Sequence, residues 1–198
     1  MLRKTYISFI VILCGVALCW ASQKIETQVG PFNLSAAPVT ESQLVSQFGE
    51  GYVRIDKVGD KILGKSRTFY SPGGSVWVEI QFSHVLDKNL ERVAETIIIT
   101  KRRLCDEKFK PKKSFGPLIT AHGVKIGDSL EKVIETYGQP SISIEVGKEK
   151  RFSVLIDELK ISKGRVLRYL TDQPGELSFA EFYFNEEGLH SFLISESE

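Results

Sequence analysis

A short capped helix with a defined stop is the clearest structural signal in this chain. The segment reads IGDSLEKVIETYGQP, from Ile126 to Pro140. Asp128 is a candidate N-cap, Glu131 follows three residues later, and the apolar residues after it repeat at helical spacing. Gly138 supplies a left-handed stop, and the proline two residues on prevents continuation. Because so short a helix is unstable alone, the pattern predicts that it packs its apolar face on a sheet.

The first half of the chain holds a second segment of this kind. Thr40 and Gln43 form a capping-box pair, and Gly49 follows the apolar positions. When Gly49 is set against Gly138, the apolar positions of the two segments coincide. The matched pairs are Leu44 with Val133, Val45 with Ile134, and Phe48 with Tyr137.

Two further landmarks recur in the same order. A Gly-Pro-apolar opening precedes each helix, at Gly30–Phe32 and at Gly116–Leu118. A turn and strand follow each helix, as PGGSVWVEIQF at Pro72–Phe82 and PGELSFAEFYF at Pro174–Phe184, with Pro, Gly, Glu and Phe aligned without a gap. Three matches in one order predict a tandem duplication.

The remaining apolar runs predict an antiparallel meander in each half. We expect strands near 52–58, 62–70, 76–82 and 96–104, and then near 142–146, 151–156, 165–170, 178–184 and 189–194. The predicted fold class is α+β, with two tandem units that each pack a short helix on an antiparallel sheet meander. The units span residues 30–107 and 116–198, and a charged linker at 108–115 joins them.

The first residues of the chain indicate export. Arg3 and Lys4 precede an apolar run, Tyr6–Ala21, that is shorter than the roughly 20 residues of a membrane-spanning helix. The pattern predicts a secretory signal over residues 1–21, cleavage before Ser22, and a periplasmic or extracellular protein. An uncleaved N-terminal anchor is the alternative. Lipidation is disfavoured, because a leucine precedes both cysteines of this segment.

Charge and cysteine content argue against a nucleic-acid-binding protein and against a protein held together by intramolecular disulfides. The chain has 26 basic and 25 acidic residues, and removal of Arg3 and Lys4 leaves 24 against 25. This balance argues against a nucleic-acid-binding protein. Only Cys105 remains beyond the predicted signal, so no intramolecular disulfide can form, and we expect this thiol to be buried. Seven basic residues between 101 and 113 are more typical of a solvated linker than of a contact for an acidic surface.

Alternation along the two matched strands defines a candidate binding surface. Side chains of successive strand residues point to opposite faces, and the apolar face should pack on the helix. The opposite, outward face then carries Trp77, Glu79, Gln81, Phe179, Glu181 and Tyr183. Aromatic anchors beside charges are typical of protein interfaces, so we predict that a protein partner binds there. The alternatives are a solvated outer face, a face that the helices or the linker at 106–114 already cover so that these residues belong to the core, and, more remotely, a carboxylate pair for acid–base catalysis.

Motifs for catalysis or metal binding are absent from the sequence. His84, His122 and His190 lie far apart without metal-ligand spacing, and no nucleophile elbow, phosphate loop or dinucleotide fingerprint occurs. Cys105 has no partner base near it in sequence. We therefore expect a non-enzymatic protein without metal or cofactor. The alternative is a small exported enzyme of the hydrolase class, with a carboxylate-based site that the sequence does not reveal.

The helix motif at Ile126–Pro140 and the closing strands at 179–194 resemble the β-lactamase-inhibitor-protein-like superfamily, which includes small outer-membrane assembly lipoproteins of the BamE (SmpA) type. That motif has an apolar residue, glycine, any residue and Ser or Thr, then a short helix ending in Gly-x-Pro. The first half follows it more loosely, with Val39-Thr40 and no glycine, and the disulfides of the inhibitor repeats are missing. The resemblance implies a tandem-repeat protein whose sheet grips another protein, for envelope assembly or inhibition.

Overall fold

The computed structural model describes most of the chain beyond its N-terminal segment. The described ranges are 28–34, 39–58, 61–73, 75–86, 91–148, 152–170 and 178–196. The predicted signal at 1–21 lies outside them, so export stays a prediction. No helix in these ranges is long and apolar enough to cross a membrane.

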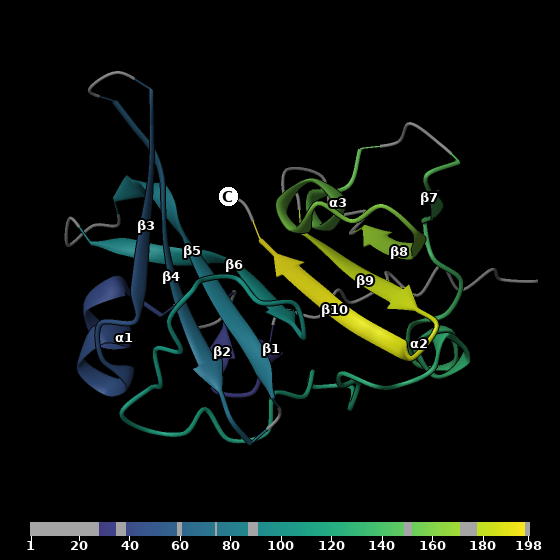
Figure 1. Ribbon diagram of the computed structural model, residues 1–198, viewed down its shortest axis with the longest axis horizontal. Coiled ribbons are helices and arrows are strands. Elements are labelled where there is room, and N and C mark those ends of the chain that lie inside the picture. Colours follow the sequence, from purple (N-terminus) through teal and green to yellow (C-terminus); the bar gives the residue numbers. More distant parts are fainter. Residues whose placement is uncertain are drawn as a thin grey trace, which may run out of the picture.

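The fold is α+β, as predicted, and it centres on one antiparallel sheet of eight strands. Four strands come from the first half of the chain, and Figure 1 shows them in blue and teal on one side of the molecule. They are β3 (Tyr52–Val58), β4 (Lys61–Ser71), β5 (Val76–Leu86) and β6 (Arg92–Thr100). The predicted strand at 96–104 therefore begins and ends four residues earlier.

Four strands from the second half complete the sheet. They are β7 (Ile142–Val146), β8 (Gly164–Leu170), β9 (Phe179–Asn185) and β10 (Gly188–Ser195). The strand order is β3-β4-β5-β6-β10-β9-β8-β7, and β6 pairs with β10. The last strands of the two halves thus form the middle of a single sheet, whereas β3 and β7 form its edges.

Two helices with similar caps lie before the two sets of strands. In α1 (Glu41–Phe48) Thr40 and Gln43 form the predicted capping box, and Gly49 ends the helix. In α2 (Leu130–Tyr137) the N-cap is Ser129 rather than the predicted Asp128. The Asp128 carboxylate instead accepts a hydrogen bond from the Lys125 backbone N–H, 2.9 Å away, which fixes the turn before the helix.

Both helices pack on the same face of the sheet, where the main core lies. Leu44 of α1 and Val133 of α2 are fully buried in this core. The sheet contributes alternate residues from its central strands: Val76, Val78, Ile80, Phe82, Ala180, Phe182 and Phe184. The predicted assignment of the apolar face is therefore confirmed.

A short N-terminal pair of strands joins the two Gly-Pro openings. The pair consists of β1 (Gln28–Val29) and β2 (Phe32–Asn33). Between them Gly30 adopts a φ of +53°, and a Cβ there would lie only 2.9 Å from the Pro117 carbonyl oxygen. Phe32 then packs on Phe115, with 5.3 Å between ring centroids. Only glycine fits this close approach, which places the first opening against the second.

A third helix replaces one predicted strand. The segment at 151–156 was expected to be extended, but α3 (Val154–Leu159) forms there, with Ser153 as its N-cap. Leu155 and Leu159 are buried, four residues apart on one helical face. They pack on the sheet face opposite α1 and α2, in a second core with Ile98, Val166 and Leu193.

Candidate binding face

The sheet face that carries α3, here called the α3 face, holds all six residues of the predicted binding surface. Strand pairing aligns Glu79 with Ile98, Ile98 with Leu193, and Leu193 with Glu181, so the two glutamates stand in one row across the sheet. Trp77 and Tyr183 stand in the neighbouring row, through Thr100 and Ser191. Gln81 and Phe179 stand in the row on the other side of the glutamates.

The expectation that these side chains stand in solvent is wrong for four of the six. Exposed fractions are 3% for Trp77, 3% for Glu79, 0% for Glu181 and 8% for Tyr183. Gln81 and Phe179 are half-buried. Local strand periodicity assigns the face of each residue, but it does not reveal what other segments lie on that face.

In the second half, α3 covers the face and depends on Glu181. One Glu181 oxygen accepts hydrogen bonds from the Ser153 hydroxyl, at 3.0 Å, and from the Leu155 backbone N–H, at 2.8 Å. The other oxygen pairs with the Arg168 guanidinium, whose Nε lies 2.7 Å away. The carboxylate thus satisfies donors at the start of α3, and the adjacent strand supplies its countercharge.

In the first half, the segment after β6 lies beside the aromatic residues of this face. The Tyr70 backbone N–H donates to the Phe109 carbonyl at 2.9 Å, and Lys108 Nζ lies 4.4 Å from the Tyr70 ring centroid. The Tyr70 ring contacts Trp77, with 5.2 Å between centroids. Figure 1 shows this teal segment running across the first-half strands. The predicted linker is therefore packed on the sheet here.

Glu79 is held by an arginine that reaches over it from the edge strand. Arg54 Nη2 lies 3.1 Å from a Glu79 oxygen and 3.2 Å from an oxygen of Glu158 in α3. Burial raises the pKa of the Glu79 carboxyl, although Arg54 and a hydrogen bond from Gln81 oppose the shift. This contact ties β3 to α3 across the face.

Hydroxyl pairs join the two halves at the β6–β10 seam. Thr96 Oγ1 and Ser195 Oγ lie 2.9 Å apart, and Thr100 Oγ1 and Ser191 Oγ lie 2.6 Å apart. All four residues are buried on the α3 face. They flank Ile98 and Leu193, so apolar contacts alternate with hydrogen-bonded hydroxyl pairs along the middle of the α3 face.

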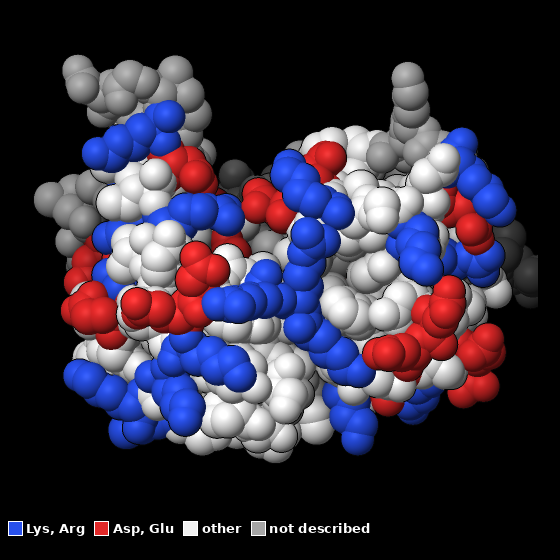
Figure 2. Space-filling model, in the orientation of Figure 1, with Lys and Arg blue, Asp and Glu red and all other residues white. Residues whose placement is uncertain are grey.

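The part of the α3 face that reaches solvent is its rim. Tyr52 on β3 is 42% exposed, and Phe152 before α3 is 69% exposed. Phe152 lies near the buried pair of the second half, with Arg168 5.7 Å from its ring centroid and bonded to its carbonyl. Figure 2 shows a notch at the upper edge of the molecule, between the β3–β4 side and the α3 side.

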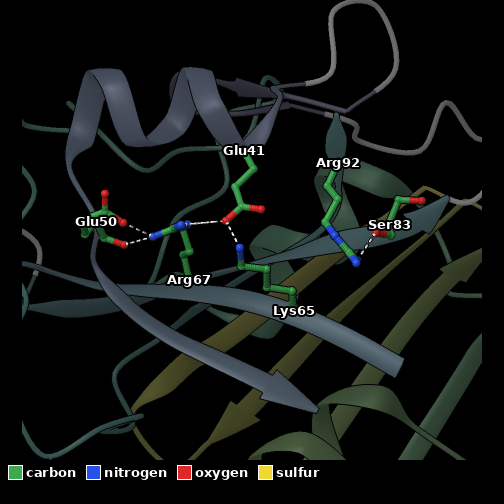
Figure 3. A network of polar contacts seen from close by, with 6 residues as sticks. All are labelled: Glu41, Glu50, Lys65, Arg67, Ser83 and Arg92. Carbon is green, nitrogen blue, oxygen red and sulfur yellow. Dashed lines mark hydrogen bonds and ion pairs between the residues drawn. The ribbon is translucent and has the colours of Figure 1, made fainter. Parts of the chain in front are cut away.

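A second charged cluster lies below α1 and includes a buried arginine. Figure 3 shows Arg67 of β4 between Glu41 and Glu50. Its Nη2 lies 2.7 Å from Glu41, which also pairs with Lys65. Burial alone would raise the pKa of Glu41, but the hydrogen bonds and charges of Lys65 and Arg67 outweigh it, so the pKa is lowered. The charges are balanced within the cluster, so it anchors α1 on the sheet.

The metal-ligating and nucleophilic side chains of the described residues do not gather at one place. They contain no group of three or more His, Cys, Asp and Glu residues that could hold a metal ion. His122 and His190 lie on separate elements, and the side chain of His84 lies outside what the structure describes. Cys105 is half-buried rather than buried, and burial raises the pKa of its thiol, which weakens it as a nucleophile.

Sequence reasoning missed four residues that define this face. Arg54 and Arg168 lie on strands that carry no motif shared by the two halves. Only the folded structure shows that Arg54 pairs with Glu79 and Arg168 with Glu181. Phe152 was placed inside a predicted strand, although Ser153 and the Leu155–Leu159 spacing indicate a helix that begins after it. Tyr52 was placed on the correct strand but not assigned to a surface.

Comparison with known proteins gives no relative: no family model, curated protein or solved structure matches this chain.

Proposed function

We propose that this chain is an exported, non-enzymatic protein-binding module that engages its partner through the rim of the α3 face. The observation that carries the proposal is the exposure of two large aromatic side chains, Tyr52 and Phe152, at that rim. Exposed aromatics gain free energy when a partner covers them, and Tyr and Trp residues are frequent anchors of protein interfaces.

The buried centre of the α3 face supports this proposal, because its side chains are already held in place before a partner binds. Glu181 and Glu79 each have an arginine partner, and the bridge from Arg54 to Glu158 fixes the distance between β3 and α3. A partner that contacts the rim then meets side chains whose supports are already ordered, which lowers the entropic cost of binding. The six residues first predicted as contacts would serve mainly as these supports.

Alanine variants at the rim test the proposal against a matched control. Tyr52→Ala and Phe152→Ala should abolish capture of a stoichiometric partner from a native extract, with melting temperatures near that of the unmodified protein. Ile55→Ala is the control, because Ile55 lies on the same strand with 44% exposure but points to the opposite face. Equal loss of capture in all three variants, or in none, would argue against the α3 face.

We also propose that the two halves arose by duplication, as in the tandem-repeat superfamily that the helix motif resembles. In its support, each half has a capped eight-residue helix followed by four strands, and the matched strands β5 and β9 each carry the buried glutamate. Superposition of α1 with β3–β6 on α2 with β7–β10 should bring Glu79 onto Glu181. A superposition that separates Glu79 from Glu181 would contradict it.

Export remains the part of this proposal that depends on sequence alone. The apolar run that ends at Ala21 supports cleavage before Ser22. Mass spectrometry of the protein from its native host should find Ser22 at the N-terminus. Retention of residues 1–21, or a lipid on Cys19, would overturn this assignment.

A carboxylate enzyme is the alternative, and one contact favours it. Glu79 and Glu158 both pair with Arg54 Nη2, but the Glu79 side chain is buried whereas the Glu158 side chain is partly exposed. Glu79 and Glu181 make a poorer pair, because three strand spacings separate them by about 14 Å, whereas glycosidase carboxylates lie about 5–10 Å apart. Any hydrolase activity on chromogenic ester or glycoside substrates that Glu79→Gln abolishes would favour the enzyme.

A further inference from the structure

A pocket of about 380 Å³ lies where α3 ends, at one end of the α3 face. Side chains from four separate segments meet in it. Arg102 follows β6, Lys160 ends α3, Lys163 precedes β8, and His190 belongs to β10. Figure 2 shows basic side chains crossing the middle of the molecule between its two halves.

The charge of this pocket is one-sided. Its lining includes three cationic side chains and no Asp or Glu. Glu186 stands outside the lining: it lies 3.4 Å from Lys163 Nζ, and its side chain is almost fully exposed. Among the described residues Arg102 pairs with no carboxylate, since its guanidinium donates only to the Lys160 carbonyl, at 3.2 Å. Most donors of the Arg102 fork are therefore available.

A chain of hydrogen bonds orients His190 at the pocket. Thr100 Oγ1 accepts from the Arg102 backbone N–H at 2.9 Å and lies 2.6 Å from Ser191 Oγ. Ser191 Oγ lies 3.0 Å from His190 Nδ1. In one of the two directions that these distances allow, the Thr100 hydroxyl donates to Ser191 and the Ser191 hydroxyl donates to Nδ1. Neutral His190 then carries its proton on Nε2, which is a hydrogen-bond donor.

We propose that this pocket binds a single oxyanion, a phosphate or carboxylate group, between Arg102, Lys163 and His190. A planar guanidinium, a lysine ammonium and an imidazole N–H together match the acceptors of such a group. A cation is disfavoured by the same charges. A free anion is enough to occupy the site, so the site does not require the protein partner of the proposed function.

The surroundings of His190 make it a reporter of the site. Burial, then Lys101 and Arg102, lower the pKa of the imidazole, while Glu187 opposes them. The Tyr183 ring and the Ser191 hydroxyl are its other close neighbours. An anion bound in the pocket adds negative charge near the ring, so it raises this pKa.

Nuclear magnetic resonance of the histidine side chains of the whole protein tests the site. Inorganic phosphate and acetate, each titrated to about 50 mM at constant ionic strength, should shift the His190 resonances saturably and raise the His190 pKa. His122, outside the pocket, should not respond. Saturation with phosphate alone would assign a phosphate site, and saturation with acetate as well would assign a general carboxylate and phosphate site.

Matched variants complete the test. Arg102→Gln and, separately, Lys163→Gln should weaken binding about tenfold or more, whereas Arg165→Gln should not, because Arg165 pairs with Glu145 outside this pocket. The variants must retain the chemical shifts of the folded protein. The proposal fails if His190 shows no saturable shift, if chloride shifts it equally, or if both pocket variants bind as well as the unmodified protein.

Discussion

The two halves of the sheet carry a buried glutamate at matching positions but neutralise it in different ways. Glu181 in β9 has its arginine on the adjacent strand and a helix directly above it. Glu79 in β5 takes Arg54 from the edge strand, two strands away. The second-half pair is closed beneath α3, whereas Arg54 keeps a side chain that is 38% exposed.

This difference shows that the alternation of residues along a strand determines which sheet face a side chain lies on, but not which segments cover that face. In the second half, residues between β7 and β8 form α3 and cover the face. In the first half, β3 pairs directly with β4, and the segment after β6 lies over the face instead. The half without a helix on this face is the one that keeps an exposed rim residue, Tyr52, on its edge strand.

The largest effect should come from the closed pair. Arg168→Ala leaves the Glu181 carboxylate buried without a countercharge, so we expect a loss of about 3–5 kcal/mol in the free energy of unfolding. Urea denaturation measures it. Arg165→Ala is the control on the same strand: its pair with Glu145 is exposed, and its removal should cost less than about 1 kcal/mol. Similar losses in both variants would contradict a closed second half.

The open pair should respond less and depend on pH. Arg54→Ala should destabilise by about 1–3 kcal/mol at pH 7, because Gln81 still binds Glu79 and solvent can reach the vacated space. Burial already raises the pKa of Glu79, so the folded state binds a proton more tightly than the unfolded state. The free energy of unfolding therefore falls as pH rises from the unfolded-state pKa of Glu79 to its higher folded-state pKa. This fall is steeper without Arg54. Unfolding curves at pH 4 and pH 7 should show the smaller loss at pH 4.

The sequence predicts elements with strong local signals and fails where distant contacts decide. Thr40, Gln43 and Gly49 define α1 from adjacent residues, and the edges β3 and β7 match their predicted bounds. In contrast, Val154 and Ile156 are β-branched and favour a strand, but capping by Ser153 and by Glu181, 28 residues from Ser153, makes α3. Burial of the predicted surface depends on α3 and on the segment after β6, and neither position is encoded in strand alternation.

A third prediction concerns the cluster under α1, which has no counterpart of this kind among the contacts described for α2. Glu41→Gln should cost roughly 1–2 kcal/mol at pH 7, because Arg67 and Lys65 lose a charged acceptor but Arg67 keeps Glu50. The pKa of Glu41 is lowered in the folded state, so its contribution is present above the unfolded pKa and is lost as pH falls through the folded pKa. The stability difference between the variant and the unmodified protein should thus shrink in acid. A difference that does not change with pH would mean that the ion pairs contribute nothing.

The smallest effect should come from the seam that joins the halves. Thr96→Val and Ser195→Ala each remove one partner of a buried hydroxyl pair at 2.9 Å, and each should cost about 1 kcal/mol. The double variant removes both groups, so no buried hydroxyl is left unpaired, and a coupling energy of about 0.5–1.5 kcal/mol should appear in a double-mutant cycle. A coupling near zero would mean that the hydroxyls do not bind across β6 and β10. Because β6 and β10 are the strands that join the halves within the eight-stranded sheet, loss of coupling accompanied by two separate unfolding transitions would show that the halves fold independently. One transition with intact coupling is the result expected of a single sheet.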